Sequence, residues 1–209
     1  QAIMKVTNIR GVIHMRTPDL NWLKDSRVFQ VNRLQAYSDH IYTIGKDKQP
    51  SSFSLNGTWK FNVSKNYDST FKFFYNTEFN DSNWNDIQVP GHIQLQGFGQ
   101  PHYTDVTYPW DGKDYVKPGQ VDMDRNKVFQ YRKSFDLPQD FINDRLILSF
   151  EGVESNIYIW LNGKFIGYSE DSFTPSRFDI TKYVQEKDNI LCVRIFEKCT
   201  GTWLEDQDM

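Results

Sequence analysis

Residues 90 to 112 combine aromatic rings with polar side chains in a segment rich in glycine and proline. This composition predicts a long loop, and binding residues concentrate on loops. Sugar hydroxyls pair with carboxylates or amides, and the C–H face of a sugar packs on aromatic rings. The segment offers both kinds of group: His92, Phe98, His102, Tyr103, Asp105, Tyr108 and Trp110. The alternative is that the rings close one end of the core and Asp105 caps a turn.

A second candidate stretch is the acidic run at residues 205–208. Glu205, Asp206 and Asp208 place three carboxylates within four residues, which repel one another unless solvent, a cation or ligand hydroxyls compensate. In an extended segment Asp206 and Asp208 share one face. Sodium and calcium prefer such oxygen ligands. The alternative is a solvated acidic run without a binding role.

Several other motifs are incomplete. Asp122, Asp124 and Asn126 imitate the start of a calcium loop, but Lys127 stands where the turn glycine belongs. The four histidines lack zinc-ligand spacing, and no phosphate-binding glycine loop or GxSxG motif is present. The adjacent carboxylates of Glu170 and its neighbour point to opposite faces in a strand, and no carboxyl pair suited to glycoside hydrolysis is identified.

The elements that position these residues are predicted to be strands. Apolar side chains of one parity recur in five segments: Trp59, Phe61 and Val63; Phe129, Tyr131 and Phe135; Leu146, Leu148 and Phe150; Ile157, Ile159 and Leu161; and Leu191, Val193 and Ile195. Asn162-Gly163 predicts a type I′ hairpin turn, because both central residues of that turn need positive φ. A short helix is expected near residues 18–24.

Composition limits the class of protein. The 209 residues carry 24 Lys and Arg against 27 Asp and Glu, and this net charge of −3 argues against general nucleic-acid binding. The longest apolar run, residues 157–161, is far shorter than the roughly 20 residues that cross a bilayer. The aromatic content of 16% favours strands and permits a sugar site. Cys192 and Cys199 are expected to be free thiols, which fits a reducing cytoplasm.

These observations predict an all-β chain with two parts. Residues 1–50 are polar without a sustained period and form a mostly irregular N-terminal arm, which we expect to lie on another surface. Residues 46–52 indicate a linker. Residues 51–209 are predicted to form a β-sandwich or jelly roll, because many short strands alternate with turn signals.

Several motifs together resemble the β-galactosidases of glycoside hydrolase family two, in the form found in Gram-positive bacteria. Their order and spacing agree along nearly the whole chain. The motifs are SLNGTWKF at 54–61, VPGH at 89–92, YTDVTYP at 103–109, WLNGKFIGYSEDS at 160–172 and LEDQDM at 204–209. The arm is also similar, through VFQVNRL at 28–34 and SDH at 38–40.

The resemblance implies that this region is the jelly-roll, galactose-binding-domain-like sugar-binding domain and not the catalytic domain. In the family, the two catalytic glutamates and the magnesium ligands lie in a later (β/α)₈ barrel. The chain would thus be a truncated part of an enzyme that hydrolyses terminal β-galactosides such as lactose with retention. Alone it is expected to be inactive.

The resemblance carries two site positions onto this sequence. Asp208 matches an aspartate that contacts galactosyl hydroxyls and ligates a sodium ion. Asp105 matches a loop position that touches the substrate, with Val106 beside it. The best-known member has asparagine at the position of Asp105, and aspartate keeps the acceptor but loses the amide donor.

The resemblance also implies partners. These are the β-galactoside, the catalytic domains of the same protein and further copies of the enzyme, or a second subunit in heteromeric forms; the arm would support this assembly. The expected location is the cytoplasm, with no nucleic-acid or membrane partner. The alternatives are an independent carbohydrate-binding module, a purely structural interaction domain, and a sister activity such as β-glucuronidase or β-mannosidase.

Overall fold

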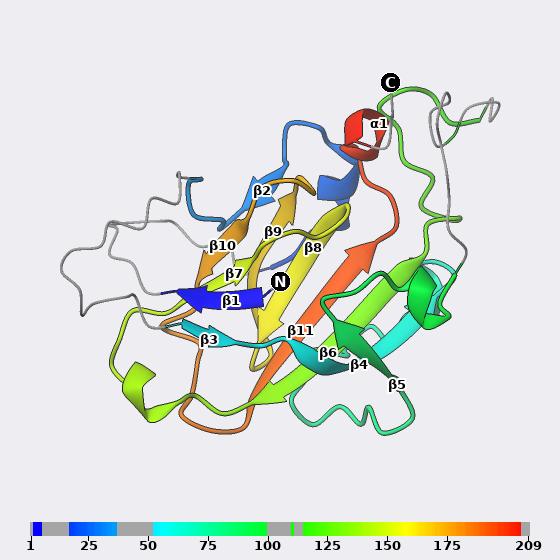
Figure 1. Cartoon of the computed structure of the whole chain (residues 1–209). Helices are drawn as coiled ribbons and strands as arrows, with labels where there is room; N and C mark the ends of the chain where they lie inside the picture. The colour runs from blue at the N-terminus through cyan, green and yellow to red at the C-terminus, as the bar shows by residue number, and fades with distance from the viewer. Residues whose placement is uncertain (1, 6–16, 37–51, 100–109, 111–114, 206–209) are drawn as a thin grey trace.

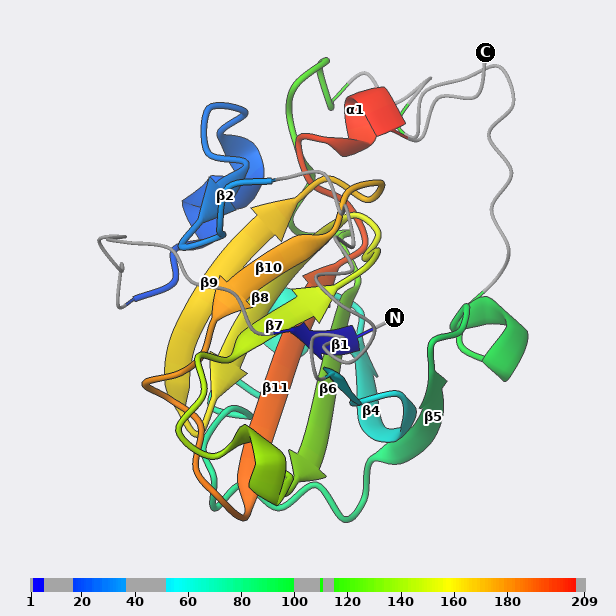
Figure 2. The same cartoon turned by 60° about the vertical axis from the view of Figure 1, so that its left-hand side comes forward.

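The computed structural model describes residues 2–5, 17–36, 52–99, 110 and 115–205, and these residues form two antiparallel sheets. The smaller sheet has the order β10-β7-β1-β3, and the larger has the order β2-β9-β8-β11-β6-β4-β5. Figures 1 and 2 show the two sheets face to face. The strands are β1 (Ala2–Lys5), β2 (Gln30–Val31), β3 (Ser52–Ser54), β4 (Gly57–Ser64), β5 (Asn85–Val89), β6 (Val128–Phe135), β7 (Ile147–Phe150), β8 (Asn156–Leu161), β9 (Lys164–Glu170), β10 (Ser176–Asp179) and β11 (Asn189–Phe196).

Helical structure in the described residues is confined to short pieces. The predicted helix near residues 18–24 is a 3₁₀ helix, η1 (Leu20–Lys24), which Asp19 caps by accepting a hydrogen bond from the Asn21 amide. The other pieces are η2 (Tyr67–Ser69), η3 (Gln94–Gln96), η4 (Gln139–Phe141) and α1 (Thr202–Glu205). None of them is long and apolar enough to cross a membrane. The prediction of an all-β sandwich is confirmed.

The predicted hairpin turn joins β8 to β9. Asn162 and Gly163 have φ values of 50° and 77°, and Leu161 pairs with Lys164 across the two-residue loop. Asn162 also accepts a hydrogen bond from the Ile190 amide through its side chain, which ties the turn to β11. Local sequence therefore determines the register of this central hairpin.

The space between the sheets holds the first hydrophobic core. Ile157, Ile159 and Leu161 of β8 point into it, as their shared parity predicts. They meet side chains from both sheets, including Trp59, Phe61, Phe129, Phe135, Leu148, Phe150, Phe178, Leu191 and Val193. Val63 differs from the expectation, since its side chain is 41% exposed. Parity determines which face a side chain occupies but not how deeply it is buried.

A second hydrophobic cluster covers the opposite face of the larger sheet. Tyr158 and Trp160, of the other parity of β8, point into this cluster. Trp22 of η1 stacks on Tyr158 with ring centroids 6.0 Å apart, and Phe74 packs edge-on against Trp160 at 5.4 Å. The covering layer therefore comes from the N-terminal region and from the loop between β4 and β5.

The described parts of residues 1–50 join this sandwich. Ala2–Lys5 forms β1 between β3 and β7, and Gln30–Val31 pairs with β9, beside which it stands in Figure 2. Arg33 reaches further and donates hydrogen bonds to the side chains of Ser169 and Thr174. The surface on which this part of the predicted arm lies is thus the sheet of its own chain. Residues 37–51, with most of the predicted linker, lie outside the described residues.

Arg132 of β6 fastens the loop between β4 and β5 to the sheet. Its side chain is 4% exposed and forms a 2.7 Å ion pair with Asp81. It also donates hydrogen bonds to the backbone carbonyls of Phe74, Asn76 and Phe79. A single guanidinium with several donors therefore satisfies carbonyls that the covering loop would otherwise bury without partners.

Glu170 is a carboxyl group buried at the end of β9. Its oxygens accept hydrogen bonds from the Tyr168 hydroxyl, the Thr200 hydroxyl at 3.1 Å and the Gly201 amide at 3.2 Å. Burial raises the pKa of Glu170 above its usual value of 4.5, although these hydrogen bonds act in the opposite direction. The other titratable and charged groups around it are Tyr158, Cys199, Glu205 and Arg33.

Both cysteines are free, as the sequence predicts, and both are buried. Burial raises the pKa of the Cys192 and Cys199 thiols to about 12. Both groups are therefore neutral thiols near pH 7, and they act as small apolar side chains in the second cluster.

We predict that Arg132→Met lowers the free energy of unfolding by about 3–5 kcal/mol, because it leaves the half-buried carboxylate of Asp81 and several buried carbonyls without their donor. Urea unfolding followed by tryptophan fluorescence measures the change. Arg27→Met is the matched control, since Arg27 pairs with Asp25 at 2.8 Å but is 87% exposed. Equal losses of unfolding free energy in the two variants would show that the burial of Arg132 does not contribute to stability.

Glu170 predicts a pH dependence of stability. With its pKa raised on folding, the folded chain keeps a proton that the unfolded chain has already lost. Its contribution to stability is therefore lost as pH rises from about 4.5 through the raised pKa. Glu170→Gln removes this loss, so urea midpoints across this window should decline less steeply than in the wild type. Glu78→Gln, which removes an exposed carboxyl group, should retain the wild-type slope. A slope for Glu170→Gln as steep as the wild-type slope would contradict the assignment.

Candidate functional site

The three predicted site residues, Asp105, Val106 and Asp208, lie outside the described residues. The structure describes residues 90–99 and Trp110 of the first stretch and Glu205, the first residue of the second. It also describes the adjoining residues 115–120 and 199–204. The candidate site is therefore built from the segments that lead into the predicted residues.

The first stretch leaves β5 through a loop that folds back on that strand. The Gln96 side chain accepts a hydrogen bond from the Gln88 amide at 2.7 Å and donates one to the Gln88 carbonyl at 3.0 Å. Gly97, with φ of 91°, ends η3 in the left-handed region that favours glycine. Phe98 then packs edge-on against Phe61 with ring centroids 4.8 Å apart. For Phe98, the alternative reading of a ring that closes the core is therefore confirmed.

The far end of the first stretch meets the segment that leads into the second. The rings of Trp110 and Trp203 lie 5.2 Å apart, between centroids, with their planes tilted by 40°. Trp203 also donates a hydrogen bond to the Gln120 carbonyl at 2.7 Å. Two stretches that are about 90 residues apart in sequence are thus brought together at one end of the sandwich, where α1 stands in Figure 1.

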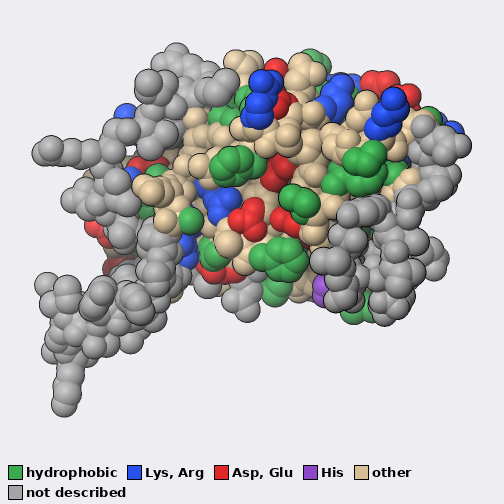
Figure 3. Space-filling view, turned by 90° about the horizontal axis from the view of Figure 1, so that it is seen from above, with side chains coloured by type: hydrophobic (Ala, Val, Ile, Leu, Met, Phe, Trp, Pro, Cys, Tyr) green, Lys and Arg blue, Asp and Glu red, His purple; other side chains and the backbone are tan. Residues whose placement is uncertain are grey.

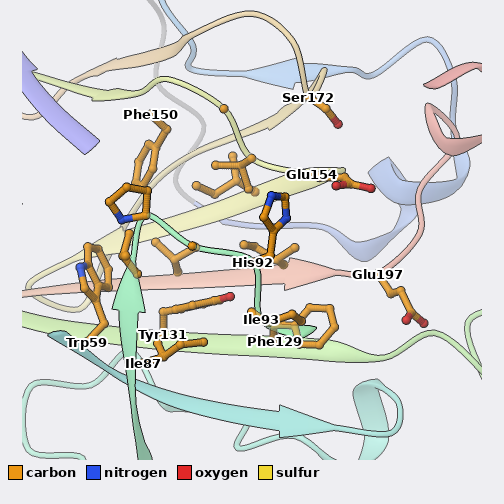
Figure 4. Close-up of a pocket in the computed structure, with 18 of the residues that line it drawn as sticks. Trp59, Ile87, His92, Ile93, Phe129, Tyr131, Phe150, Glu154, Ser172 and Glu197 are labelled. Atoms are coloured by element: carbon orange, nitrogen blue, oxygen red, sulfur yellow. The ribbon is translucent and has the colours of Figure 1, made fainter. Parts of the chain in front are cut away.

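A pocket of about 760 Å³ opens between the two sheets and is lined by both stretches. The first stretch contributes His92 and Gln94, and the second contributes Glu205. The apolar part of the lining includes Trp59, Ile87, Phe129, Tyr131, Phe150 and Val193. In Figure 4, Trp59, Ile87 and Phe150 lie toward one end of the pocket, while Glu154, Ser172 and Glu197 lie toward the other.

The polar end of the pocket is acidic. Glu154, Glu197 and Glu205 line it, and Glu197 pairs with Lys127 at 2.9 Å. Figure 3 views the molecule from above Figure 1 and shows acidic side chains near the middle of this face, with hydrophobic side chains beside them. Carboxylate acceptors next to apolar and aromatic surface are the combination that binds polyhydroxylated ligands.

The segment that leads into the second stretch is held by the end of β9 and the residues just after it. Glu170 binds Thr200 and Gly201 as described above, and Ser172, two residues beyond the end of β9, binds Glu205. Adjacent Asp171 turns away and accepts hydrogen bonds from the Phe173 and Thr174 amides. The sequence predicts these opposite directions for Glu170 and Asp171. It does not predict that Glu170 is buried against a segment some 30 residues away. The only nearby residue in the sequence that could indicate this burial is Tyr168, which lies on the same face of the strand and binds Glu170.

Metal binding is not indicated among the described residues, where no group of three or more His, Cys, Asp or Glu side chains gathers. The rejected calcium motif is a turn, in which Asp122 accepts hydrogen bonds from the Asp124 and Arg125 amides. Asp208, for which the resemblance implies a sodium ion, lies outside this part of the chain.

Comparison with known proteins places these features in a family. Residues 53–209 match the sugar-binding domain of the glycosyl hydrolases of family 2. A β-galactosidase from Halalkalibacterium halodurans is 50% identical over 196 residues, which cover 91% of this chain and 19% of that protein. The large subunit of a β-galactosidase from Leuconostoc lactis is 45% identical over 207 residues, which cover 91% of this chain and 33% of that protein.

The chain thus spans between about a fifth and a third of the length of these two relatives. Among solved structures, a β-glucuronidase from an uncultured Clostridium aligns with 68% of this chain and 21% of its own, at 27% identity and a TM-score of 0.46. The family match covers the strands from β4 to β11 and both stretches that meet at the pocket. The chain belongs to the glycosyl hydrolases of family 2 and carries their sugar-binding domain.

Proposed function

We propose that this chain is the non-catalytic N-terminal part of a β-galactosidase that hydrolyses terminal β-galactosides such as lactose with retention. Identity of 40–50% with β-galactosidases and β-galactosidase large subunits supports the activity. The role of the domain is supported by the contact between the rings of Trp110 and Trp203. This contact brings together, at one end of the sandwich, two segments that are distant in sequence. This domain would supply one wall of a substrate pocket that a catalytic domain completes.

In this proposal the predicted residues act by positioning. Asp208 accepts hydrogen bonds from galactosyl hydroxyls, and Asp105 and Val106 contact the sugar from the neighbouring loop. Such contacts accelerate the reaction to the extent that they tighten in the transition state. Asp208 would also ligate sodium together with residues outside this chain, and magnesium would bind in the catalytic region. The nucleophile and the general acid/base would lie there as well.

The proposed setting is an oligomeric enzyme in the cytoplasm. Two buried free thiols fit a reducing compartment. A large subunit among the relatives supports the proposal that this type of chain can belong to a heteromeric enzyme.

The 209-residue chain alone should not hydrolyse a chromogenic β-galactoside, since the proposed catalytic carboxylates lie outside it. The assay uses chain purified from a host that lacks β-galactosidase, with the full-length enzyme as positive control. Turnover that co-purifies with the chain would contradict the proposal.

Calorimetric titration of galactose into the same chain separates the proposal from an independent binding module. The pocket supplies carboxylates and aromatic surface without any other domain, which is the observation that favours a module. We expect no binding at millimolar galactose, because half of the site would be missing. Millimolar or tighter binding would favour the module.

Asp208→Ala in the full-length enzyme should cost about 3 kcal/mol of transition-state stabilisation, or roughly 10²-fold in kcat/KM. The substitution should also weaken the response of the rate to sodium. Steady-state kinetics across a sodium series measures both effects. Asp86→Ala is the control, because Asp86 is an exposed aspartate that pairs with Lys60 at 2.9 Å. An unchanged rate and sodium response for Asp208→Ala would refute its assigned role.

A further inference from the structure

The end of β9 holds the segment of residues 200–205 at two points. At the first point, Glu170 of β9 accepts hydrogen bonds from the Thr200 hydroxyl at 3.1 Å and the Gly201 amide at 3.2 Å. Glu170 is only 5% exposed, and the Tyr168 hydroxyl binds its other oxygen. Hydrogen bonds are stronger in the interior than in water, and a satisfied buried network makes the groups that it joins more rigid.

At the second point the direction of the hydrogen bonds is reversed. Glu205 of the segment supplies the carboxylate, and Ser172 supplies the donors. The Ser172 amide binds Glu205 Oε1 at 3.1 Å, and the Ser172 hydroxyl binds Glu205 Oε2 at 2.7 Å. Both carboxylates lie near Gly201: a methyl group there would lie 3.4 Å from Glu170 Oε2 and 3.9 Å from the Glu205 carboxyl carbon.

The segment depends on these contacts for its conformation. Its helix, α1, has four residues, and so short a helix is not stable in water on its own. Leu204 is 83% exposed and contributes little burial. The segment is therefore held by contacts with the rest of the chain, rather than by a core of its own. These contacts are the hydrogen bonds with Glu170 and Ser172, the bond from the Thr200 amide to the Leu23 carbonyl, the burial of Thr202 and the packing of Trp203 on Trp110.

We infer that Ser172 and Glu170 are positioning residues of the substrate site, which orient the chain that carries Asp208. Asp208 follows Glu205 by three residues, so its reach is at most about 10 Å from the point that Ser172 holds. In this inference, the anchor at Glu205 limits the positions that Asp208 can reach. This inference rests on the proposed function, in which Asp208 orients the sugar.

The first test measures the anchor in the 209-residue chain by amide hydrogen exchange. Ser172→Ala should speed exchange at Leu204 and Glu205, whose amides bind the Gly201 carbonyl, and leave β8 and β11 unchanged. Ser149→Ala is the matched control, because the Ser149 hydroxyl binds the carboxylate of Glu151 at 2.8 Å in the other sheet. Unchanged exchange at both amides in Ser172→Ala would overturn the anchor.

The second test is a double-mutant cycle in the full-length enzyme. Ser172→Ala should lower kcat/KM roughly tenfold, as expected for loss of a hydrogen bond to a charged group. In the Asp208→Ala background the same substitution should have no further effect, since Ser172 acts through Asp208. Thr200→Val, which removes the hydroxyl that binds Glu170 without changing the shape of the side chain, should behave in the same way. Ser149→Ala should leave kcat/KM unchanged.

The outcomes separate this inference from the proposed function. If Asp208→Ala slows the enzyme but Ser172→Ala does not, or if their effects on kcat/KM simply multiply, the positioning role is overturned and the proposed function stands. If Asp208→Ala has no effect on kcat/KM, the proposed function fails and the positioning role fails with it. A purely structural role for Ser172 would lower the unfolding temperature without coupling to Asp208 in the cycle.

Discussion

The structure depends on the burial of both faces of its seven-stranded sheet. All six residues of β8 are buried, although a strand in a simple sandwich exposes every second side chain. One parity of β8 packs between the two sheets, and the other packs under the N-terminal region and the loop between β4 and β5. These covering segments are therefore part of the folded core, because their removal would expose Tyr158 and Trp160 to water.

A covering layer made of loops buries backbone polar groups that have no partner of the kind that a strand provides, and these groups need other hydrogen-bond partners. Buried arginines supply such partners. Arg132 binds three loop carbonyls and a carboxylate, and Arg194 lies about 5 Å from the ring centroids of Tyr67, Phe74 and Trp160. Burial lowers the pKa of Arg194, but the aromatic faces around it favour the cation. Polar satisfaction and aromatic packing thus support the same layer.

The pocket lies between the two sheets, where side chains on the inner face of the larger sheet meet the loops that leave β5 and β11. The chain after β11 has no strand partner there, and β9 holds it instead through Glu170 and Ser172. Glu170, which is buried in the folded core, and the segment that leads into the predicted site are therefore joined by the same hydrogen bonds.

The sequence by itself determined the strands, the hairpin at Asn162-Gly163 and the family. Strand parity and turn conformation depend on neighbouring residues, and the motifs occur in a fixed order along the chain. Asp105, Val106 and Asp208 were also named from the sequence, and they stay predictions because they lie outside the described residues. Only the tertiary structure decided that Val63 is exposed, that Glu170 is buried and that Trp110 meets Trp203. Each of these depends on which distant segment packs against a given face, and contacts across 30 to 90 residues leave no local pattern in the sequence.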